Sequence, residues 1–400
     1  MGGGFFFRIP CVSLLKVAAL TPPGWEVTII DEKVEPLDLN LEADLVGITS
    51  MTTTVQRGYE LGDHFRKRGI KVVMGGMHAS ALPEEAIAHC DSVVIGEAEN
   101  LWQALIADFE SDQLKRIYRH DQQFPCLGES PLPDWSLIRG KNYLPVHLVE
   151  TTRGCPIDCE FCAVSTAFGG RYRNRPLEEV MLELRGLKPF DGLLTLKNCV
   201  FFVDDNIVSN RTYAREMLTR LAEHKFRWFG QASMNIARDP EILRLCQQSG
   251  CVGLFIGFES LSPETLAAVG KRVNRPDEYL EIVQRVHDHG IGIDGSFVFE
   301  NADRPSPEKV DTIISKVRVY YHRRNSHEHD QKNLYERVQT GSASAARDQR
   351  QERRPDRTGS GSWPRLSFPL EIQVLSGGPL SFSRARSGQA GAGAAPAIGA

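Results

Sequence analysis

The sequence predicts an α/β protein with two domains, a linker between them and a disordered tail. Three observations support this prediction. The chain has 400 residues, which is too long for one ordinary domain. Predicted strands alternate with predicted helices in two separate stretches, at 25–110 and from 144 onward. The regular hydrophobic spacing ends after residue 318.

The first domain is predicted over residues 1–110. Its strands are expected to be short, apolar and rich in β-branched residues, at 25–31, 44–50, 70–75 and 91–95. Helical spacing with a charged face covers 54–68 and ends at Gly69, and a second helix is expected at 98–109. Apolar strands that alternate with helices indicate a parallel sheet covered on both faces. We therefore expect a Rossmann-like, doubly wound domain.

The second domain is predicted over residues 144–318 and repeats the strand–helix alternation. Its strands are expected at 146–153, 199–204, 227–233, 252–258 and 292–299. Its helices are expected between them, at 176–187, 211–224, 239–249 and 276–289. This spacing favours a parallel barrel. Five strands are counted here, so the barrel is expected to be partial.

Two segments are predicted to lie outside these domains. Residues 111–143 contain Pro125, Pro131 and Pro133 and show little periodicity, so we expect a linker that crosses the surface. Residues 319–400 are polar and then rich in Gly and Ala, without a regular period. Such a segment buries too little apolar surface to offset the entropy lost on ordering, so we expect a disordered tail.

Composition and charge argue against several kinds of partner. The formal net charge is −4 and the isoelectric point is near 6.3, so neither nucleic acid nor an anionic membrane is expected. No stretch approaches the roughly 20 apolar residues of a membrane-spanning helix. The first ten residues do not form a convincing signal peptide. We therefore expect a cytoplasmic protein.

The cysteines fall into a cluster and a scattered set. Their number is nine, and an odd count argues against a disulfide framework. Scattered cysteines such as Cys199 and Cys246 are expected to be small buried hydrophobic residues. Three others, Cys155, Cys159 and Cys162, have the spacing C-x3-C-x2-C directly after a predicted strand.

Three thiolates on one short loop can bind a compact metal–sulfur unit. With three local cysteines, one iron of a four-iron cluster lacks a protein ligand and can bind a substrate or cofactor. The alternative is structural zinc, which usually has four ligands in paired spacings. No second cysteine pair lies at zinc-ribbon distance and no histidine lies near the loop, so we favour the cluster.

The spacing, with Phe161 before the third cysteine, resembles the signature of radical S-adenosylmethionine (SAM) enzymes. The resemblance implies a [4Fe–4S] cluster on Cys155, Cys159 and Cys162, with the amino and carboxylate groups of SAM on the open iron. An electron from the cluster would cleave SAM to methionine and a 5′-deoxyadenosyl radical. The family fold is a partial (βα)6 barrel with the cluster at its C-terminal mouth, where barrel active sites lie.

Polar residues end three strands of the predicted barrel, and the resemblance implies that they contact the methionine and ribose of SAM. They are Asp204, Asp205, Gln231, Ser233, Asn235, Glu259 and Ser260. For Asp204 and Asp205 the alternative is helix N-capping, which we expect of one of them. Glu259 closes an apolar strand and needs a polar partner, which favours a functional role. No catalytic residue is assigned.

Glycines and hydroxyl residues follow successive strands of the first domain, at the edge where a doubly wound sheet binds a nucleotide-like ligand. Their order resembles the cobalamin-binding domains that precede radical SAM barrels. The resemblance implies cobalamin contacts from Ser50, Thr52, Gly75, Gly76, Gly96 and Glu97. The cobalt-ligating motif D-x-H-x-x-G is absent, as is usual in this group, which leaves the lower cobalt face open. The alternative is a Rossmann-like domain that has lost its cofactor and only docks the barrel. A dinucleotide is disfavoured because no G-x-G-x-x-G follows a strand.

The resemblance covers roughly residues 12–318 and leaves both ends atypical. We expect the first Rossmann strand and the sixth barrel strand to be missing, as after a truncation or a frameshift.

The two cofactors together imply methylation of an unactivated carbon, with methylcobalamin as the methyl donor. A radical cyclase or oxidase and a non-catalytic cobalamin- or iron–sulfur-binding remnant are the alternatives. The expected partners are a small-molecule or lipid substrate and an external one-electron reductant of the flavodoxin or ferredoxin type.

Overall fold

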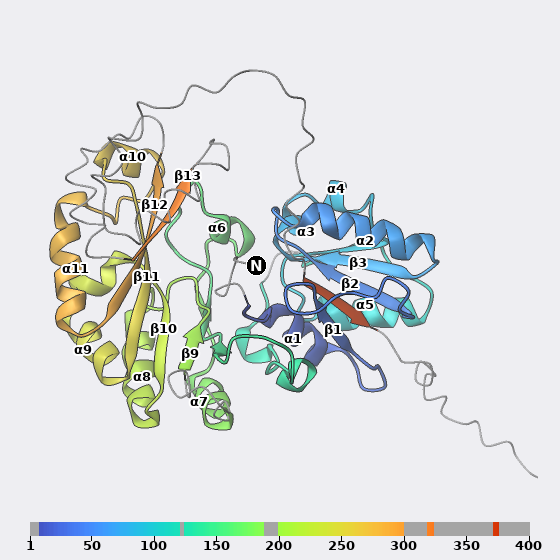
Figure 1. Ribbon diagram of the computed structural model, residues 1–400, viewed down its shortest axis with the longest axis horizontal. Helices are drawn as coiled ribbons and strands as arrows, with labels where there is room; N and C mark the ends of the chain where they lie inside the picture. Colours follow the sequence, from blue (N-terminus) through green and yellow to red (C-terminus); the bar gives the residue numbers. More distant parts are fainter. Residues whose placement is uncertain (1–7, 121–123, 188–198, 300–317, 324–370, 376–400) are drawn as a thin grey trace, which may run out of the picture. The chain divides into compact units, whose positions relative to one another are not determined.

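The computed structural model describes residues 8–120, 124–187, 199–299, 318–323 and 371–375. These residues form two compact units (Figure 1). The first unit runs to Pro125, resumes at Pro131–Tyr143 and includes the strand at 371–375. The second unit contains Cys126–Ser130 and the described residues from Leu144 to 323.

The first unit is built on a six-stranded sheet with the order β1-β14-β2-β3-β4-β5. The strands are β1 (Thr28–Asp31), β2 (Leu45–Thr49), β3 (Lys71–Gly75), β4 (Ser92–Ile95), β5 (Ile117–Arg119) and β14 (Glu371–Leu375). The run from β2 to β5 is parallel, whereas β14 is antiparallel to both β1 and β2. The carboxyl ends of β2, β3 and β4 therefore meet at one edge of the sheet.

Helices cover both faces of this sheet. They are α1 (Val12–Leu20), α2 (Val55–Lys67), α3 (Gly76–Ala81), α4 (Pro83–Ala86) and α5 (Leu101–Glu110), with a short 3-10 turn, η3, at Trp135–Ile138. Val46 and Ile48 of β2 pack with Phe65 of α2. Leu45, one residue along the same strand, packs with Leu105 of α5 instead. This alternation explains why α2 and α5 lie on opposite faces in Figure 1, as the predicted doubly wound domain requires.

Two strands of the first unit were not expected from the sequence. β5 lies in the segment predicted to be a linker, and its three residues are too few to show strand alternation. β14 lies in the segment predicted to be a disordered tail. The sheet therefore gains a strand beside β1 from the far end of the chain, while the tail around β14 lies outside the described residues.

The second unit contains a six-stranded parallel sheet with the order β13-β12-β11-β10-β9-β6. The strands are β6 (His147–Val149), β9 (Cys199–Phe202), β10 (Arg227–Ala232), β11 (Cys251–Glu259), β12 (Gly292–Phe299) and β13 (Arg318–Arg323). β13 pairs with β12 over six residues, so the expectation that the sixth strand is missing was wrong. Its sequence RVYYHR has the β-branched and aromatic residues of a strand, but the polar residues that follow it hid this signal.

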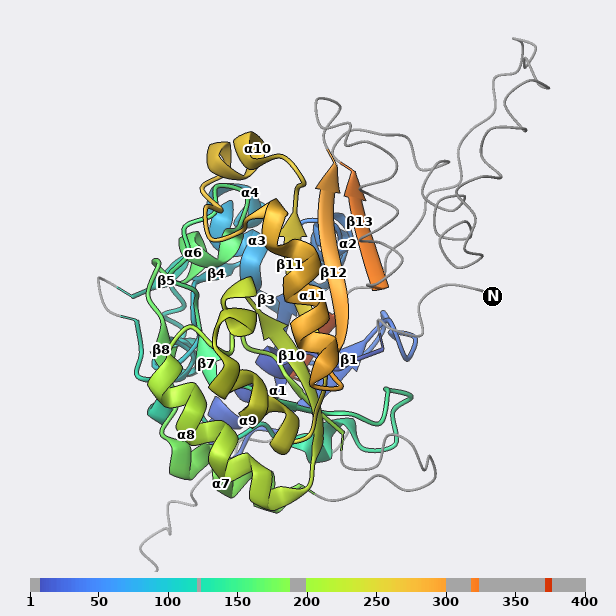
Figure 2. The ribbon, with the colours of Figure 1, turned by 90° about the vertical axis from the view of Figure 1, so that its left-hand side faces the viewer.

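Helices α8 (Arg211–Leu221), α9 (Pro240–Gln248) and α11 (Tyr279–Asp288) cover one face of this sheet, as Figures 1 and 2 show. Their apolar side chains join those of the strands in one large buried cluster. The shorter elements of the unit are β7 (Thr152–Arg153), α6 (Ala163–Ala167), β8 (Arg173–Asn174), α7 (Leu177–Gly186) and α10 (Pro263–Ala268). Its 3-10 turns are η2 (Leu127–Glu129), η4 (Ala222–His224), η5 (Met234–Arg238) and η6 (Pro276–Glu278).

Cys199 and Cys246 are buried, as the sequence predicts, and all nine cysteines have free thiols. None of the helices in the described part of the chain combines the length and the apolar character that crossing a bilayer requires.

Candidate functional site

The three clustered cysteines lie on a loop that follows β7 in the second unit. β7 and β8 pair as a short antiparallel ladder, with Thr152 opposite Asn174 and Arg153 opposite Arg173. This ladder closes the base of the loop. Gly154 begins the loop with φ of 90°, and a Cβ there would lie 2.0 Å from the backbone oxygen of Arg171. Glycine is therefore required for the chain to turn this tightly.

The three thiols share one environment. Cys159 is buried, and Cys155 and Cys162 are half-buried. Burial raises the pKa of the Cys159 thiol to about 11; the nearby cation of Lys271 opposes this rise, and the other two cysteines add to it. Among the described residues, no three acidic, histidine or cysteine side chains converge on one metal-ion position. In a cubane cluster each thiolate binds a different iron, and three soft thiols on one loop are the donor set for such a cluster.

Asp204 and Asp205 follow β9 and hold the start of this loop. Oδ1 of Asp204 accepts hydrogen bonds from the backbone N–H groups of Thr151 and Thr152, the first at 2.9 Å, and from both hydroxyl groups. Oδ2 of Asp205 accepts one from the N–H of Gly154 at 2.9 Å. The N-cap of the next helix is instead Asn210. The expectation that one of the two aspartates caps a helix was therefore wrong.

Asn206, the amide that follows the two aspartates, connects the loop to the next strand. Its Nδ2 lies 3.9 Å from Sγ of Cys155, and its Oδ1 accepts a hydrogen bond of 3.1 Å from the N–H of Ser233. Gln231 ends β10 and is half-buried. Asn235 lies in η5, where its Oδ1 accepts a hydrogen bond from Arg238. These polar residues share the carboxyl edge of the sheet with the cysteine loop, because β6, β9 and β10 are parallel.

Glu259 and Ser260 end β11 at the same edge, and both are buried. The carboxylate of Glu259 lies 2.6 Å from Nζ of Lys271, so the polar partner expected for this residue is present. Ser260 accepts a hydrogen bond from the N–H of Ser262. Lys271 was missed by the sequence reasoning, because it is separated from Glu259 by the whole of α10.

In the first unit, the residues predicted to bind cobalamin lie in three loops at the carboxyl edge of the sheet. Ser50 and Thr52 follow β2, Gly75 ends β3, Gly76 begins α3, and Gly96 follows β4. Gly76 has φ of 88°, and a Cβ there would lie 2.3 Å from Oγ1 of Thr49. The backbone at Gly76 therefore approaches the end of β2 more closely than any side chain allows.

Further hydrogen bonds tie these three loops together. The N–H of Gly96 donates to Oγ of Ser80 at 2.9 Å. Thr52 Oγ1 lies 3.1 Å from Nδ1 of His78, a buried residue that the sequence did not single out. Glu97 is buried beside Gly96, and its backbone oxygen lies 3.1 Å from Nε2 of His120. Only the stretch G-G-M-H-A-S, which contains both His78 and Ser80, gave a signal for them in the sequence.

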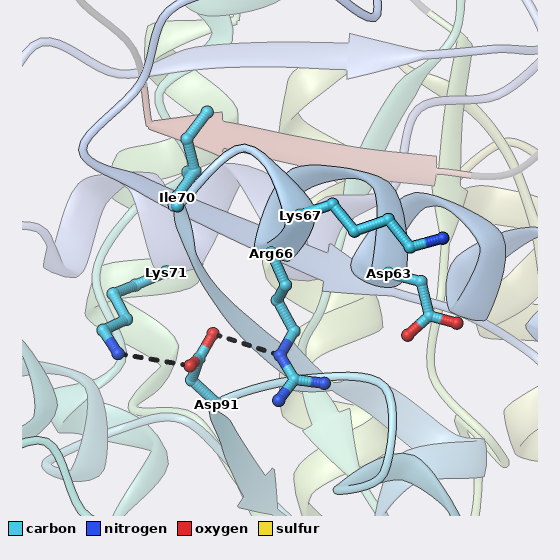
Figure 3. Close-up of a pocket in the computed structure, with 7 residues that line it drawn as sticks. Asp63, Arg66, Lys67, Ile70, Lys71 and Asp91 are labelled. Carbon is cyan, nitrogen blue, oxygen red and sulfur yellow. Dashed lines mark hydrogen bonds and ion pairs between the residues drawn. The ribbon is translucent and has the colours of Figure 1, made fainter.

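A surface hollow of about 390 Å³ lies elsewhere on the first unit (Figure 3). It is lined by the end of α2, the start of β3 and Asp91. Asp91 pairs with Arg66 at 3.7 Å and with Lys71 at 3.3 Å, which offsets the positive charge of the hollow. The hollow lies where β3 and β4 begin, so it is opposite the edge that carries Ser50 and Gly76.

Comparison with known proteins identifies the class of enzyme. The sequence profile of the radical SAM superfamily matches residues 149–305, and that of the B12 binding domain matches residues 9–106. Two curated relatives from Chlorobaculum tepidum are bacteriochlorophyllide d methyltransferases. The C-12(1) enzyme is 34% identical over 72% of this chain and 64% of its own length. The C-8(2) enzyme is 32% identical over 77% of this chain and 70% of its own length.

The chain therefore belongs to the radical SAM enzymes that carry a cobalamin-binding domain. It spans about two thirds of the length of these two relatives. Among solved structures, the radical SAM methyltransferase TsrM from Kitasatospora setae, with cobalamin and a [4Fe–4S] cluster bound, superimposes with a TM-score of 0.52. It is 17% identical, and the match covers 68% of this chain and 61% of TsrM. This likeness supports the two-part fold.

Proposed function

We propose that this chain is a cobalamin-dependent radical SAM methyltransferase that methylates an unactivated carbon of a small molecule or lipid. The observation that carries the proposal is the three-cysteine loop at the carboxyl edge of the second unit, with its base fixed by Asp204 and Asp205. The names of the two Chlorobaculum relatives make a bacteriochlorophyllide-like macrocycle the first substrate class to test.

In this proposal Cys155, Cys159 and Cys162 would hold the cluster, and its iron without a protein ligand would bind SAM. When bound, the cluster supplies the electron that cleaves SAM, and cobalamin supplies the methyl group. Asp204 is fully buried and its Oδ1 is occupied by four donors. We therefore assign it, with Asp205, to positioning the loop rather than to contacting SAM.

The SAM contacts are proposed to come from the ends of β10 and β11. They are Gln231, Ser233, Asn235, Glu259 and Ser260. Three of them, at 231, 233 and 235, are half-buried at the edge where the cysteine loop lies, so part of each residue remains exposed there. Glu259 and Ser260 are buried at the carboxyl end of β11, and we propose that they line the base of the SAM site at this edge.

Cobalamin is proposed to bind at the carboxyl edge of the first unit, through Ser50, Thr52, Gly75, Gly76, Gly96 and Glu97. Support comes from the close backbone approach at Gly76 and from the bond between Gly96 and Ser80, which fix the loops without placing bulky side chains there. A Rossmann-like domain that only docks the barrel is the competing possibility.

A flavodoxin- or ferredoxin-type reductant and a cytoplasmic location complete the proposal.

Anaerobic reconstitution with iron and sulfide tests the central claim. We expect about four irons per chain, and an EPR spectrum of the reduced protein that changes when SAM is added. The variant with Cys155, Cys159 and Cys162 all changed to Ala should bind no cluster, whereas Cys246→Ala should bind it normally. A colourless or zinc-loaded wild-type protein would overturn the proposal.

Product analysis separates the enzyme from its alternatives. Reduced protein with SAM should release 5′-deoxyadenosine, and a labelled SAM methyl group should appear in the substrate. A remnant that only binds cofactors releases no 5′-deoxyadenosine. A cyclase or oxidase releases it without transferring the label.

A further inference from the structure

An ion pair closes the carboxyl end of β11. Oε1 of Glu259 lies 2.6 Å from Nζ of Lys271, and both side chains are almost buried, with 11% and 12% of their surfaces exposed. The pair lies directly over Gly257, where a Cβ would be 2.1 Å from Oε1 of Glu259 and 2.6 Å from Nζ of Lys271. Any side chain at position 257 would collide with the ion pair, which explains why β11 has a glycine there.

Glu259 has a strained backbone, with φ of 65° in the left-handed region. Such a conformation is unfavourable for a non-glycine residue and persists only where neighbouring contacts enforce it. Asn274 provides one of these contacts, because its Nδ2 donates to the backbone oxygens of Gly257 and Phe258, both at 2.9 Å. The ion pair with Lys271 provides another. The direction of the Glu259 side chain is therefore fixed by the segment that follows α10.

The same segment packs against the cysteine loop. The N–H of Glu160 donates to the backbone oxygen of Val269 at 3.0 Å. Gly270 has φ of 75°, and a Cβ there would lie 2.6 Å from the backbone oxygen of Asp158. Nζ of Lys271 lies 5.8 Å from the centre of the Phe161 ring, within the range of a cation–π contact. Lys271 thus contacts both Glu259 and the loop that carries the cysteines.

The positive charge of Lys271 affects the electrostatics of the cluster site. Three thiolates and the carboxylate of Glu259 place several negative charges in a partly desolvated region, where they repel each other strongly. An additional electron on the cluster increases that repulsion. A cation held beside the loop offsets it, and the reduction potentials of iron–sulfur clusters respond to local net charge.

We propose that Lys271 is a positioning residue that orients Glu259 and raises the reduction potential of the cluster through its positive charge. The inference rests on the proposed function, because it requires a cluster on the three cysteines. It adds a residue outside the cysteine motif that sets how readily the site accepts an electron.

The test is an EPR-monitored redox titration of the reconstituted full chain without SAM. Lys271→Met should shift the midpoint potential downward, and Glu259→Gln should shift it upward, because the first removes a positive charge and the second a negative one. Lys271→Arg should restore the wild-type potential. Lys225→Asn is the control: it removes an exposed lysine between η4 and β10, where φ is 53° and asparagine is tolerated.

Opposite shifts separate an electrostatic role from a purely structural one, since loosening of the loop would move both variants in the same direction. Loss of iron in Lys271→Met with recovery in Lys271→Arg would also support the positioning role, provided that circular dichroism shows a folded chain. A wild-type potential in Lys271→Met, or shifts of the same sign in both variants, would overturn the inference. A wild-type chain that takes up no iron would instead refute the proposed function itself.

Discussion

Replacing Asp204 with asparagine is expected to change how the stability of the second unit depends on pH. The carboxyl group of Asp204 is fully buried at the end of β9, and its Oδ2 has no hydrogen-bond partner among the described residues. Burial is the main cause that raises the pKa of Asp204, to about 7, although hydrogen bonds from Thr152 and Thr151 oppose the rise. The folded chain therefore favours the neutral acid.

The size of the effect follows from linkage. The pKa of Asp204 rises from 3.8 in the unfolded chain to about 7 in the folded one, so between these values the folded state holds a proton that the unfolded state has lost. This contribution to stability is fully present below about pH 4 and is lost as the pH rises toward 7. A shift of about three pKa units corresponds to roughly 4 kcal/mol. An asparagine amide does not titrate, so Asp204→Asn should lack this dependence.

Urea titrations of the apo-chain at several pH values between about 4 and 8 measure the effect. Other groups titrate in this range, so the informative quantity is the difference in unfolding free energy between variant and wild type. That difference should shift in favour of the variant as the pH rises. Asp277→Asn, which changes an exposed aspartate of the same unit, is the matched control. A difference for Asp204→Asn that is independent of pH would refute the reasoning.

Two further predictions concern the cofactors. Cys159→Ala should lose nearly all bound iron after reconstitution while the buried Cys246→Ala retains it, as counted by a colorimetric iron assay; equal iron in both would contradict the assigned ligands. Gly76→Ala should weaken cobalamin binding at least about tenfold in an absorbance titration, because the added methyl group would lie 2.3 Å from Oγ1 of Thr49 at a left-handed φ. Gly24→Ala has a similar φ but open space around it, and should bind cobalamin like the wild type.

The sequence predicts most of the fold because the long strands are strongly apolar. β11 and β12, with nine and eight residues, lie where the apolar runs were found. The strands that were missed have weak local signals. β5 has three residues, and β13 stands at the start of a polar segment. Their pairing with β4 and β12 is a tertiary contact that hydrophobic periodicity within one segment does not report.

In the candidate site, too, local patterns could be predicted from the sequence and tertiary contacts could not. The spacing of the cysteines is a local pattern, so it could be recognised from the sequence alone. The partner of Glu259 could be expected but not identified, because Lys271 becomes its neighbour only after α10 turns the chain back. The resemblance implied that Asp204 contacts SAM. The residues that hydrogen-bond to it in the structure, Thr151 and Thr152, precede it by about fifty residues and could not be identified from the sequence.

The three residues that follow β9 show how the sheet itself sets the position of the cysteine loop. Asp204–Asn206 bond in order to Thr152, Gly154 and Cys155, so consecutive side chains of one strand end contact successive points of the loop. Asn206 also accepts from Ser233, which couples the first cysteine to the end of β10. Each of these bonds joins two groups of the chain itself, so the end of β9 holds Thr152, Gly154 and Cys155 directly. A loop held in this way loses less conformational entropy on binding a ligand than an unstructured segment does.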